Sequence, residues 1–338
     1  MPSTAASSAP PSPSARRPAL LRAALALLLL LAPQVASAWP DQPVRITVPF
    51  AAGGPTDTLA RLVAGAMGRY LGRQVLVENV VGAGGTVGAA RVARAAPDGD
   101  TLLLINLTQA TSARMYRRLP YDPIRSFAPI GLIADVPMTL VGRPDLPIGD
   151  LRALIEHMRV NDESVTMGHA GLGTSSHLCR LLLTGASHTT VVDVPYQGTG
   201  PALQDLLGGQ IDLLCDQTSG TTGAIRAGRL RAYALTGPAR LATLPDLPTA
   251  AEAGLPQLLL VVWHGLYAPA GTPAATVARL AAALQAAVTD PAVAQRMREL
   301  GGVMVPREQA TPEALAAKLA AESVRLVGIL DAAGVKAY

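Results

Sequence analysis

The feature of this 338-residue chain that most constrains its fold is a repeated order of strand, glycine-rich loop and helix. It is first seen in "VPFAAGGPTDTLAR" (residues 48–61), where a strand expected over 44–50 breaks at paired glycines and an amphipathic helix follows over 57–71. A strand over 74–80 leads into "GAGGT" and a second helix, and a third strand, "TLLLIN", occupies 101–106. Strands joined by crossover helices lie parallel, so this succession predicts an α/β fold with mostly parallel sheets flanked by helices.

The same order restarts after a segment rich in proline and aspartate, residues 120–147. Three strand-like runs are each followed by a glycine-containing loop and a helix, at 165–170, 189–196 and 211–216. Two more strands and three C-terminal helices are expected at 231–237, 258–269, 272–288, 290–300 and 311–334. The sequence therefore predicts two α/β units, each with its own glycine-rich loops.

Residues 1–38 have the pattern of a secretory signal peptide. Three arginines flank an apolar run from Leu20 to Leu31, and "VASAWP" supplies the small residues of a cleavage site after Ala38. The run is about a dozen residues, shorter than the roughly 20 that a membrane-spanning helix needs, which disfavours the alternative of a membrane anchor. The Arg16–Arg17 pair leaves twin-arginine export open beside the general route.

Charge disfavours one class of partner. The chain has 28 basic and 24 acidic residues, and the predicted signal peptide holds three of the arginines and none of the acids, which leaves a net charge of +1 for the exported part. A nucleic-acid-binding surface needs a clear excess of basic side chains. We therefore expect no nucleic-acid partner.

Cys179 and Cys215 are the only two cysteines of the chain. An exported protein folds in an oxidising compartment, so we expect a disulfide between them. A loop of this length stabilises the fold by about 4 kcal/mol in the chain-entropy model. The alternative is a pair of buried free thiols, one on a helix and one on a strand.

The glycine loops have a candidate function. In an open parallel sheet, ligands bind beyond the carboxyl ends of the strands, where helix N-termini present unpaired N–H groups that attract anions. Glycines let the backbone approach a ligand closely, and Pro55, Thr56 and Asp57 suit the start of a helix. The pattern indicates an anion site, although glycine turns that merely connect strands to helices remain the alternative.

Patterns for catalysis and for cofactors are absent from the sequence. "GAGGTVG" places Val87 where a dinucleotide fingerprint needs its third glycine, and no Walker lysine follows either loop. There is no G-x-S-x-G elbow, and Ser175, Ser176 and His177 are too close in sequence to form a triad alone. The histidines show no metal-site spacing. We therefore expect no enzyme activity, no cofactor and no metal.

Five segments, in order, carry a resemblance to a known family: "WPDQPVRITVPFAAGGPTDTLAR", "GAGGTVGAARVARAAPDGDTLL", "VPYQGTGPALQDLLGGQIDLLCDQ", "LPDLPTAAEAG" and "WHGLYAPAGTP". From Trp39 to the last helix the chain resembles the substrate-binding proteins of tripartite tricarboxylate transporters, the Bug family. The resemblance implies a two-lobed periplasmic binding protein, type II-like, whose α/β lobes close on a ligand like a Venus flytrap. By analogy the first lobe comprises residues 39–141 plus 267–338, and the second comprises 142–266.

The resemblance also implies where the ligand lies. Family members hold one ligand carboxylate with backbone amides and ordered water between the first two βα loops, which match 50–57 and 84–86 here; neither contains lysine or arginine. The far end of the ligand meets the second lobe, whose matching segments are 169–177, 196–199 and 216–217. The ligand-binding residues expected are Phe50, Ala51, Gly53, Gly54, Thr56, Asp57, Gly84, Gly85, Thr86, Asn106, His169, Gly173, Thr174, Ser175, His177, Tyr196 and Asp216.

The roles of two aspartates stay open. Asp57 either caps a helix or faces an ammonium group of the ligand, and Asp216 is either such a counter-charge or a structural aspartate near the hinge. A second carboxylate or an aromatic ring on the ligand would instead make His169, His177 and Thr174 more relevant. The sequence does not choose among these ligands.

The predicted function is that of a monomeric periplasmic protein that captures a small carboxylate and delivers it to the membrane subunits of a tripartite tricarboxylate transporter. Two alternatives remain: a ligand-presenting protein that reports to a sensor kinase, and a secreted enzyme that uses the same cleft. The missing nucleophile–base pair disfavours the enzyme.

Overall fold

The computed structural model describes residue 5 and residues 42–161 and 164–337. The predicted signal peptide and its cleavage point after Ala38 lie outside the described residues. Within the described part, every helix is too short or too polar to cross a bilayer.

The first three strands are parallel, as predicted, and have the spatial order β2-β1-β3. Their bounds are Val44–Val48 (β1), Val75–Asn79 (β2) and Thr101–Asn106 (β3). The connections carry α2 (Pro55–Leu71), a short 3-10 turn η2 (Ala83–Gly85) and α3 (Thr86–Ala93). Helix α2 starts at proline in its first position and ends at Gly72, which adopts the left-handed conformation with φ 65°.

A second set of three parallel strands has the order β7-β5-β6. The strands are β5 (Thr166–His169), β6 (Val192–Pro195) and β7 (Leu213–Gln217), followed by α6 (Ser175–Ser187), α7 (Thr199–Leu207) and α8 (Thr218–Arg226), respectively. Strand β8 (Arg231–Leu235) pairs antiparallel with β4. These elements occupy the places that the sequence predicts for the second unit.

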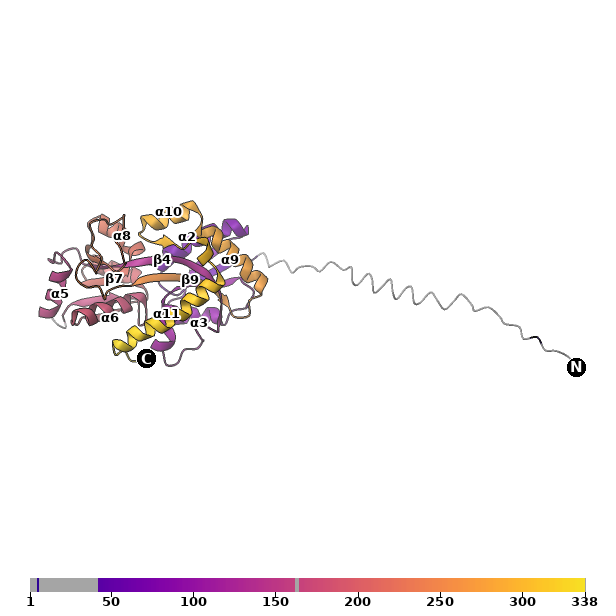
Figure 1. Ribbon diagram of the computed structural model, residues 1–338, viewed down its shortest axis with the longest axis horizontal. Coiled ribbons are helices and arrows are strands. Elements are labelled where there is room, and N and C mark those ends of the chain that lie inside the picture. The colour runs from indigo at the N-terminus through magenta and orange to yellow at the C-terminus, as the bar shows by residue number, and fades with distance from the viewer. Residues whose placement is uncertain (1–4, 6–41, 162–163, 338) are drawn as a thin grey trace. The chain divides into compact units, whose positions relative to one another are not determined.

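Two long antiparallel strands connect the two sets, β4 (Phe127–Gly142) and β9 (Val261–Pro269). Strand β9 lies between β3 and β4, and β4 pairs with β9 as far as Pro137. From Met138 onward β4 pairs instead with β7 and β8. Figure 1 shows β4 and β9 side by side between the two groups of strands and helices. The α/β fold is confirmed, and the sheet is mixed because of these strands.

Strand β4 lies within residues 120–147, the segment rich in proline and aspartate. Its prolines stand where a strand tolerates them: the pairing register shifts between Pro129 and Gly131, and Pro137 is the last residue that pairs with β9. Most of its residues are buried, so it shows no alternating pattern of polar and apolar residues. A strand without alternation and with two prolines is difficult to recognise from sequence.

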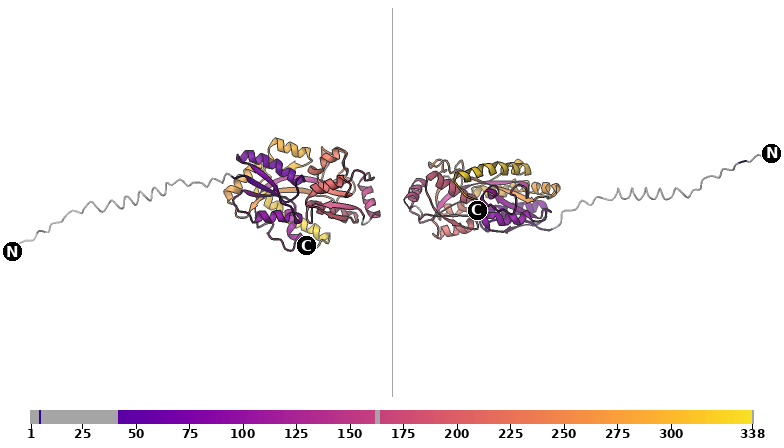
Figure 2. Two further views of the ribbon diagram at one scale, coloured as in Figure 1. Left: turned by 180° about the vertical axis from the view of Figure 1, so that it is seen from behind. Right: turned by 90° about the horizontal axis from the view of Figure 1, so that it is seen from below.

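The remaining elements are helices and turns around the sheet and one short strand that pairs antiparallel with β4. They are α4 (Thr108–Met115), α5 (Leu151–Val160), α9 (Ala274–Val288), α10 (Pro291–Glu299), β10 (Val303–Met304), η3 (Arg307–Gln309) and α11 (Pro312–Ala332). Helices α9 and α11 both pack on β4, and the right-hand view of Figure 2 shows α11, in yellow, along one face of the sheet. The three C-terminal helices were predicted, whereas α4 and α5 were not.

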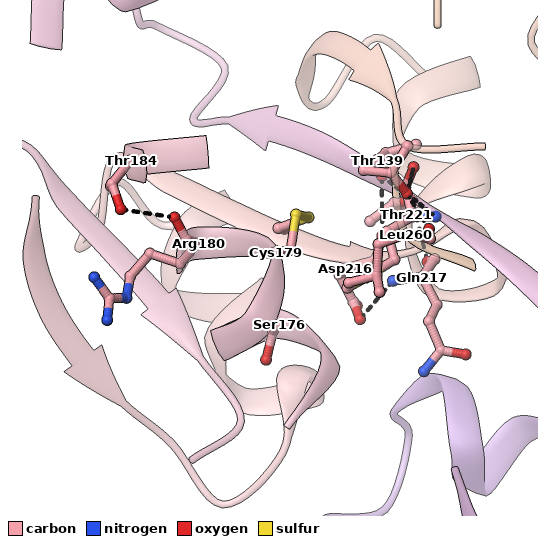
Figure 3. The surroundings of a disulfide bond; sticks show 12 residues. Thr139, Ser176, Cys179, Arg180, Thr184, Asp216, Gln217, Thr221 and Leu260 are labelled. Atoms are coloured by element: carbon pink, nitrogen blue, oxygen red, sulfur yellow. Dashed lines mark hydrogen bonds between the residues drawn. A yellow bond between two sulfur atoms is a disulfide. The ribbon is translucent and has the colours of Figure 1, made fainter. Parts of the chain in front are cut away.

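Cys179 of α6 and Cys215 of β7 form a disulfide, with their Cα atoms 6.2 Å apart. Both residues are fully buried. Figure 3 shows the bond with Ser176 on one side and Asp216 on the other. The predicted disulfide is confirmed.

Candidate functional site

The loops that follow β1, β3, β5, β6 and β7 meet around one small cavity. Ten residues line it: Phe50, Gly54, Pro55, Thr56, Asn106, Ala170, Thr174, Ser175, Thr199 and Gln217. None of them carries a charge. The free space is about 20 Å³, which is room for about one water molecule. The lining residues follow strands of both parallel sets, so the cavity lies where the two halves of the fold meet.

Four helices begin at this cavity with their N-termini unprotected by side chains. In the described part of the chain, no side chain caps the first turn of α2, α6, α7 or α8, whose N-cap residues are Gly54, Thr174, Gly198 and Gln217. Elsewhere, the side chains of Asp150, Asp290 and Thr311 cap α5, α10 and α11. Helices α3, α4 and α9 also begin without a side-chain cap, so what distinguishes the four helices at the cavity is that their N-termini converge. Backbone N–H groups at four helix ends are therefore directed toward a shared space that is suited to an anion.

Asp57 stabilises the loop after β1 through hydrogen bonds and does not line the cavity. Its carboxylate accepts hydrogen bonds from Gly53 N–H (3.0 Å), from Arg61 Nε and Nη2 (2.9 and 3.0 Å) and from Asn79 Nδ2 (2.9 Å). Asn79 Nδ2 also donates to the carbonyl oxygen of Phe50. Burial alone would raise the pKa of Asp57, but these hydrogen bonds, led by that of Arg61, hold it below the usual value. The aspartate is thus fully engaged by the loop after β1, by α2 and by β2.

The second glycine loop contacts the opposite loop instead of the cavity. A Cβ atom on Gly84 would lie 2.5 Å from the carbonyl oxygen of Leu172, and one on Gly171 would lie 3.0 Å from Gly84 Cα. Gly84 and Gly85 have positive φ of 60° and 96°. Thr86 donates its hydroxyl hydrogen to Ala83 O. This loop needs glycine because two backbones approach closely there.

A similar contact closes the other side of the cavity. Ala51 N–H donates to the carbonyl oxygen of Gln197 at 2.9 Å, and a Cβ atom on Gly198 would lie 2.9 Å from Ala51 N. Gly54 also approaches the second half, since its Cβ would lie 3.6 Å from Gly200 N. Backbone-to-backbone contacts therefore join the two halves on both sides of the site.

His169 and His177 shape the loop between β5 and α6. Their buried rings have centroids 5.1 Å apart, and their Nδ1 atoms accept the Gly171 and Gly173 N–H groups, respectively. Burial lowers the pKa of both, and that of His177 falls to about 3 with further effects of Arg180 and His169. Both rings are neutral at ordinary pH, and neither lines the cavity. They act as hydrogen-bond acceptors within the loop.

Two other predicted residues lie beside the cavity without lining it. Gly173 O accepts the Thr111 hydroxyl at 2.6 Å, a contact between the two halves. Tyr196 donates its hydroxyl hydrogen to Asp205 Oδ2 at 2.7 Å. Burial, followed by the effect of Asp205, raises the pKa of Tyr196 to about 12.

Asp216 is buried behind the wall. Its Oδ1 accepts the Gln217 N–H at 2.8 Å. Asp216 is 1% exposed and does not line the cavity. Burial raises the pKa of this carboxyl to about 7, although the Thr199 side chain and the Gln217 backbone N–H partly oppose that effect.

Of the seventeen ligand-binding residues expected from the sequence, six line the cavity: Phe50, Gly54, Thr56, Asn106, Thr174 and Ser175. The expected set did not include Pro55, Ala170, Thr199 and Gln217, although all four lie in the segments matched by resemblance. The sequence feature that could have identified three of them is their place at the start of a helix: Pro55 and Thr199 are first residues, and Gln217 is a capping residue. Among the described residues, no group of three His, Cys, Asp or Glu side chains could hold a metal ion.

A family model described as "Tripartite tricarboxylate transporter family receptor" matches residues 59–330. The chain is similar to the solved structure of the periplasmic binding protein BugD, with 44% identity, a TM-score of 0.87, and coverage of 88% of this chain and 100% of the other.

Two further solved structures from Rhodopseudomonas palustris are similar and contain ligands. MatC with bound malate is 40% identical, with a TM-score of 0.83 over 86% of this chain and 99% of the other. Rpa4515 with adipate is 31% identical, with a TM-score of 0.84 over 89% of this chain and 100% of the other.

Proposed function

We propose, since the chain belongs to the tripartite tricarboxylate transporter receptor family, that it captures a small organic carboxylate at the cavity between its two halves, which must move apart to enlarge the free space of about 20 Å³ for the ligand. The resemblance to the Bug family and the two-lobed α/β architecture that it implied are both confirmed. The family and fold are those of periplasmic solute-binding proteins. The ligand of this chain and the route of delivery are part of the proposal.

The observation that carries the proposal is the convergence of four uncapped helix N-termini on a cavity without charged lining residues. An anion near a helix N-terminus gains typically 0.3–1 kcal/mol, and up to about 2 kcal/mol when partly buried. Neutral donors avoid the large cost of desolvating two opposite charges. A carboxylate can therefore be held firmly and still be released.

The lining also bears on the alternative of an enzyme. The ten residues include Ser175 and three threonines but no histidine, aspartate, glutamate, lysine or cysteine. A hydroxyl nucleophile without a neighbouring general base is unreactive. This composition supports binding without chemical conversion.

We propose the crossing strands as the hinge of a two-lobed receptor. The predicted lobes, 39–141 plus 267–338 and 142–266, meet along β4 and β9, and the partner change of β4 at Met138 falls close to the first boundary. The contacts of Ala51 with Gln197 and of Thr111 with Gly173 are of the kind that a closed cleft makes. Ligand contacts from both lobes would favour this closed form over an open one.

The proposal extends to export and delivery. A signal peptide over residues 1–38, cleaved after Ala38, would place a monomeric receptor in the periplasm. Membrane subunits of a tripartite tricarboxylate transporter are the proposed recipients of the ligand. Family membership supports this assignment, because the family model is described as a receptor of such transporters.

The test is a thermal-shift screen of the chain from Trp39 onward against malate, adipate, tricarboxylates, aromatic acids and acidic amino acids. A ligand at about 100 times its dissociation constant stabilises the fold by about 2.7 kcal/mol. The matched controls are the neutral amides of the same acids. A saturable shift with one acid class and none with its amide supports the proposal, and no shift with any acid contradicts it.

A further inference from the structure

Asp216 is a buried carboxyl group next to the cavity, at the end of β7. No described residue donates a hydrogen bond to its Oδ2, whereas Oδ1 accepts the Gln217 N–H. Helix α8 encloses the carboxyl from one side, since a Cβ atom on Gly220 would lie 2.7 Å from Oδ2 and 3.0 Å from Pro55 Cγ. Figure 3 shows Asp216 and Gln217 side by side, with the Gln217 side chain extending away from the disulfide.

The immediate neighbours of this carboxyl are uncharged: Thr139 on β4, Thr199 on α7, Gly220 on α8 and Pro55 on α2. Most titratable and charged side chains on the elements packed around Asp216 have other partners: Asp57 pairs with Arg61, His169 with Gly171, His177 with Gly173, Arg180 with Asp193, and Asp205 with Tyr196. Two others are distant: Asp135 lies in the part of β4 that pairs with β9, and Arg226 is the last residue of α8. Among the described residues, therefore, no cation is in place to stabilise an ionised Asp216.

Burial makes the charged form of Asp216 costly, which is why its pKa is raised to about 7. An anionic ligand in the cavity adds a second negative charge close to the carboxyl. Two negative groups in a shared enclosed site disfavour ionisation further. Binding of the anionic ligand and protonation of Asp216 therefore stabilise each other.

Thr199 lies between the carboxyl and the cavity, since it lines the cavity and its side chain is close enough to Asp216 to lower the pKa of that carboxyl. A hydroxyl group has one hydrogen to donate. Beside an ionised Asp216, Thr199 would turn to donate that hydrogen to the carboxylate, which leaves its lone pairs facing the ligand. Beside a protonated Asp216, Thr199 can accept from the carboxyl and donate to the ligand.

We propose, on the basis of the function proposed above, that Asp216 keeps its proton whenever an anionic ligand occupies the cavity, and that the protonated carboxyl orients the Thr199 hydroxyl toward that ligand. Asp216 is then a positioning residue, and ligand capture takes up a proton at alkaline pH. An ammonium-bearing ligand that paired with an ionised Asp216 would show the opposite pH dependence.

The first test measures the affinity for malate, adipate and aspartate by calorimetry between about pH 5 and pH 9. For one linked proton, affinity falls about tenfold per pH unit above the pKa of the free carboxyl. Malate or adipate should therefore bind the native chain about fivefold more weakly at pH 8 than near pH 7, where Asp216 is already half ionised, and about tenfold more weakly again at pH 9, and D216N should show no such dependence. The matched control is D246N, which alters an exposed aspartate of the same half and should keep the native pH profile.

Two further measurements keep the proposal testable if D216N folds poorly. Titration of the native chain in two buffers with different enthalpies of ionisation counts the protons taken up on binding. Thr199→Val should weaken binding near pH 6 about tenfold, the loss expected for a hydrogen bond to a charged group, and Thr199→Ser should restore it.

The outcomes separate this proposal from the proposed function. Acid binding with an identical affinity across the pH range, or aspartate binding that strengthens with pH, overturns the role of Asp216 while leaving the binding function intact. If none of the acids binds at any pH, the binding function fails for these acids. The infrared difference spectrum between the native chain and D216N then shows whether Asp216 is protonated. A protonated-carboxyl band near pH 6 supports the proposed role of Asp216, and a missing band overturns that role.

Discussion

Cys179 and Cys215 link α6 to β7, the two elements whose ends supply Ser175 and Gln217 to the cavity. Cys179 follows Ser175 by about one helical turn, and Cys215 precedes Gln217 by two residues. The bond therefore joins two elements that border the site.

Replacing both cysteines with alanine should lower the melting temperature and leave ligand binding in place. The disulfide spans 36 residues, for which the chain-entropy model gives about 4 kcal/mol. Thermal unfolding of the variant beside the native chain, each with and without reductant, measures the effect. The native chain should respond to reductant and the variant should not; equal melting temperatures would contradict a stabilising bond.

Asp57→Ala should destabilise the fold more than Arg61→Ala. Removal of the carboxylate takes away the acceptor of the Gly53 N–H and one of the two acceptors of Asn79 Nδ2, at about 1–3 kcal/mol, whereas the Arg61 side chain is 53% exposed and its ion pair is worth less. Denaturant unfolding of the two variants measures the difference. The same loss from both variants would show that the ion pair, and not the loop contacts, is what matters.

The lowered pKa of Asp57 gives its contribution a defined pH dependence. A carboxyl whose pKa is lower in the folded than in the unfolded state stabilises the fold above the unfolded value, and this stability is lost as pH falls through the folded value. The native chain should therefore lose stability relative to Asp57→Asn as the pH falls from about 5 to about 3. Parallel stability curves for the two proteins over that range would contradict the assignment.

Gly84→Ala should weaken ligand binding without unfolding the chain. The new Cβ would lie 2.5 Å from the carbonyl oxygen of Leu172 and would push apart the two loops that meet beside the cavity. The control is Gly185→Ala, where a Cβ on helix α6 meets nothing within 4 Å. Binding of an acid identified in the screen, measured for both variants, should decrease only for Gly84→Ala; native affinity there would mean that the loop contact does not contribute to closure.

Much of the fold could be predicted because local chemistry and long-range structure agree. Gly53, Gly85 and Gly198 have φ of 78°, 96° and 139°, which glycine adopts readily, so the glycine pairs mark true strand-to-helix turns. The helices between them have one apolar face. Strand β4 was missed because its burial removes the alternating pattern and its two prolines resemble loop signals.

The site was predictable at the level of segments more than of single residues. Thr199 and Gln217 enter the cavity because the loops after β6 and β7 converge, and that convergence depends on strand order, which one sequence does not specify. The two candidate aspartates also differ in how far their surroundings could be predicted from the sequence. Asp57 finds its partners nearby in α2 and β2, whereas the burial of Asp216 results from α2, α7 and α8 together.

The central claim, that helix N–H groups hold the ligand carboxylate, is tested most directly at Ser175, the first residue of α6. Proline is tolerated at this helix position and removes its N–H, and Thr174 before it already has the extended ψ of 165° that a following proline requires. Ser175→Ala is the matched control, because it removes the hydroxyl and keeps the N–H.

The measurement is the affinity of both variants, by calorimetry, for the acid that binds the native chain. A hydrogen bond to a charged group contributes about 1.5–3 kcal/mol, so Ser175→Pro should bind at least about tenfold more weakly than Ser175→Ala. Equal affinities of two folded variants would contradict the claim that the N-terminus of α6 binds the carboxylate.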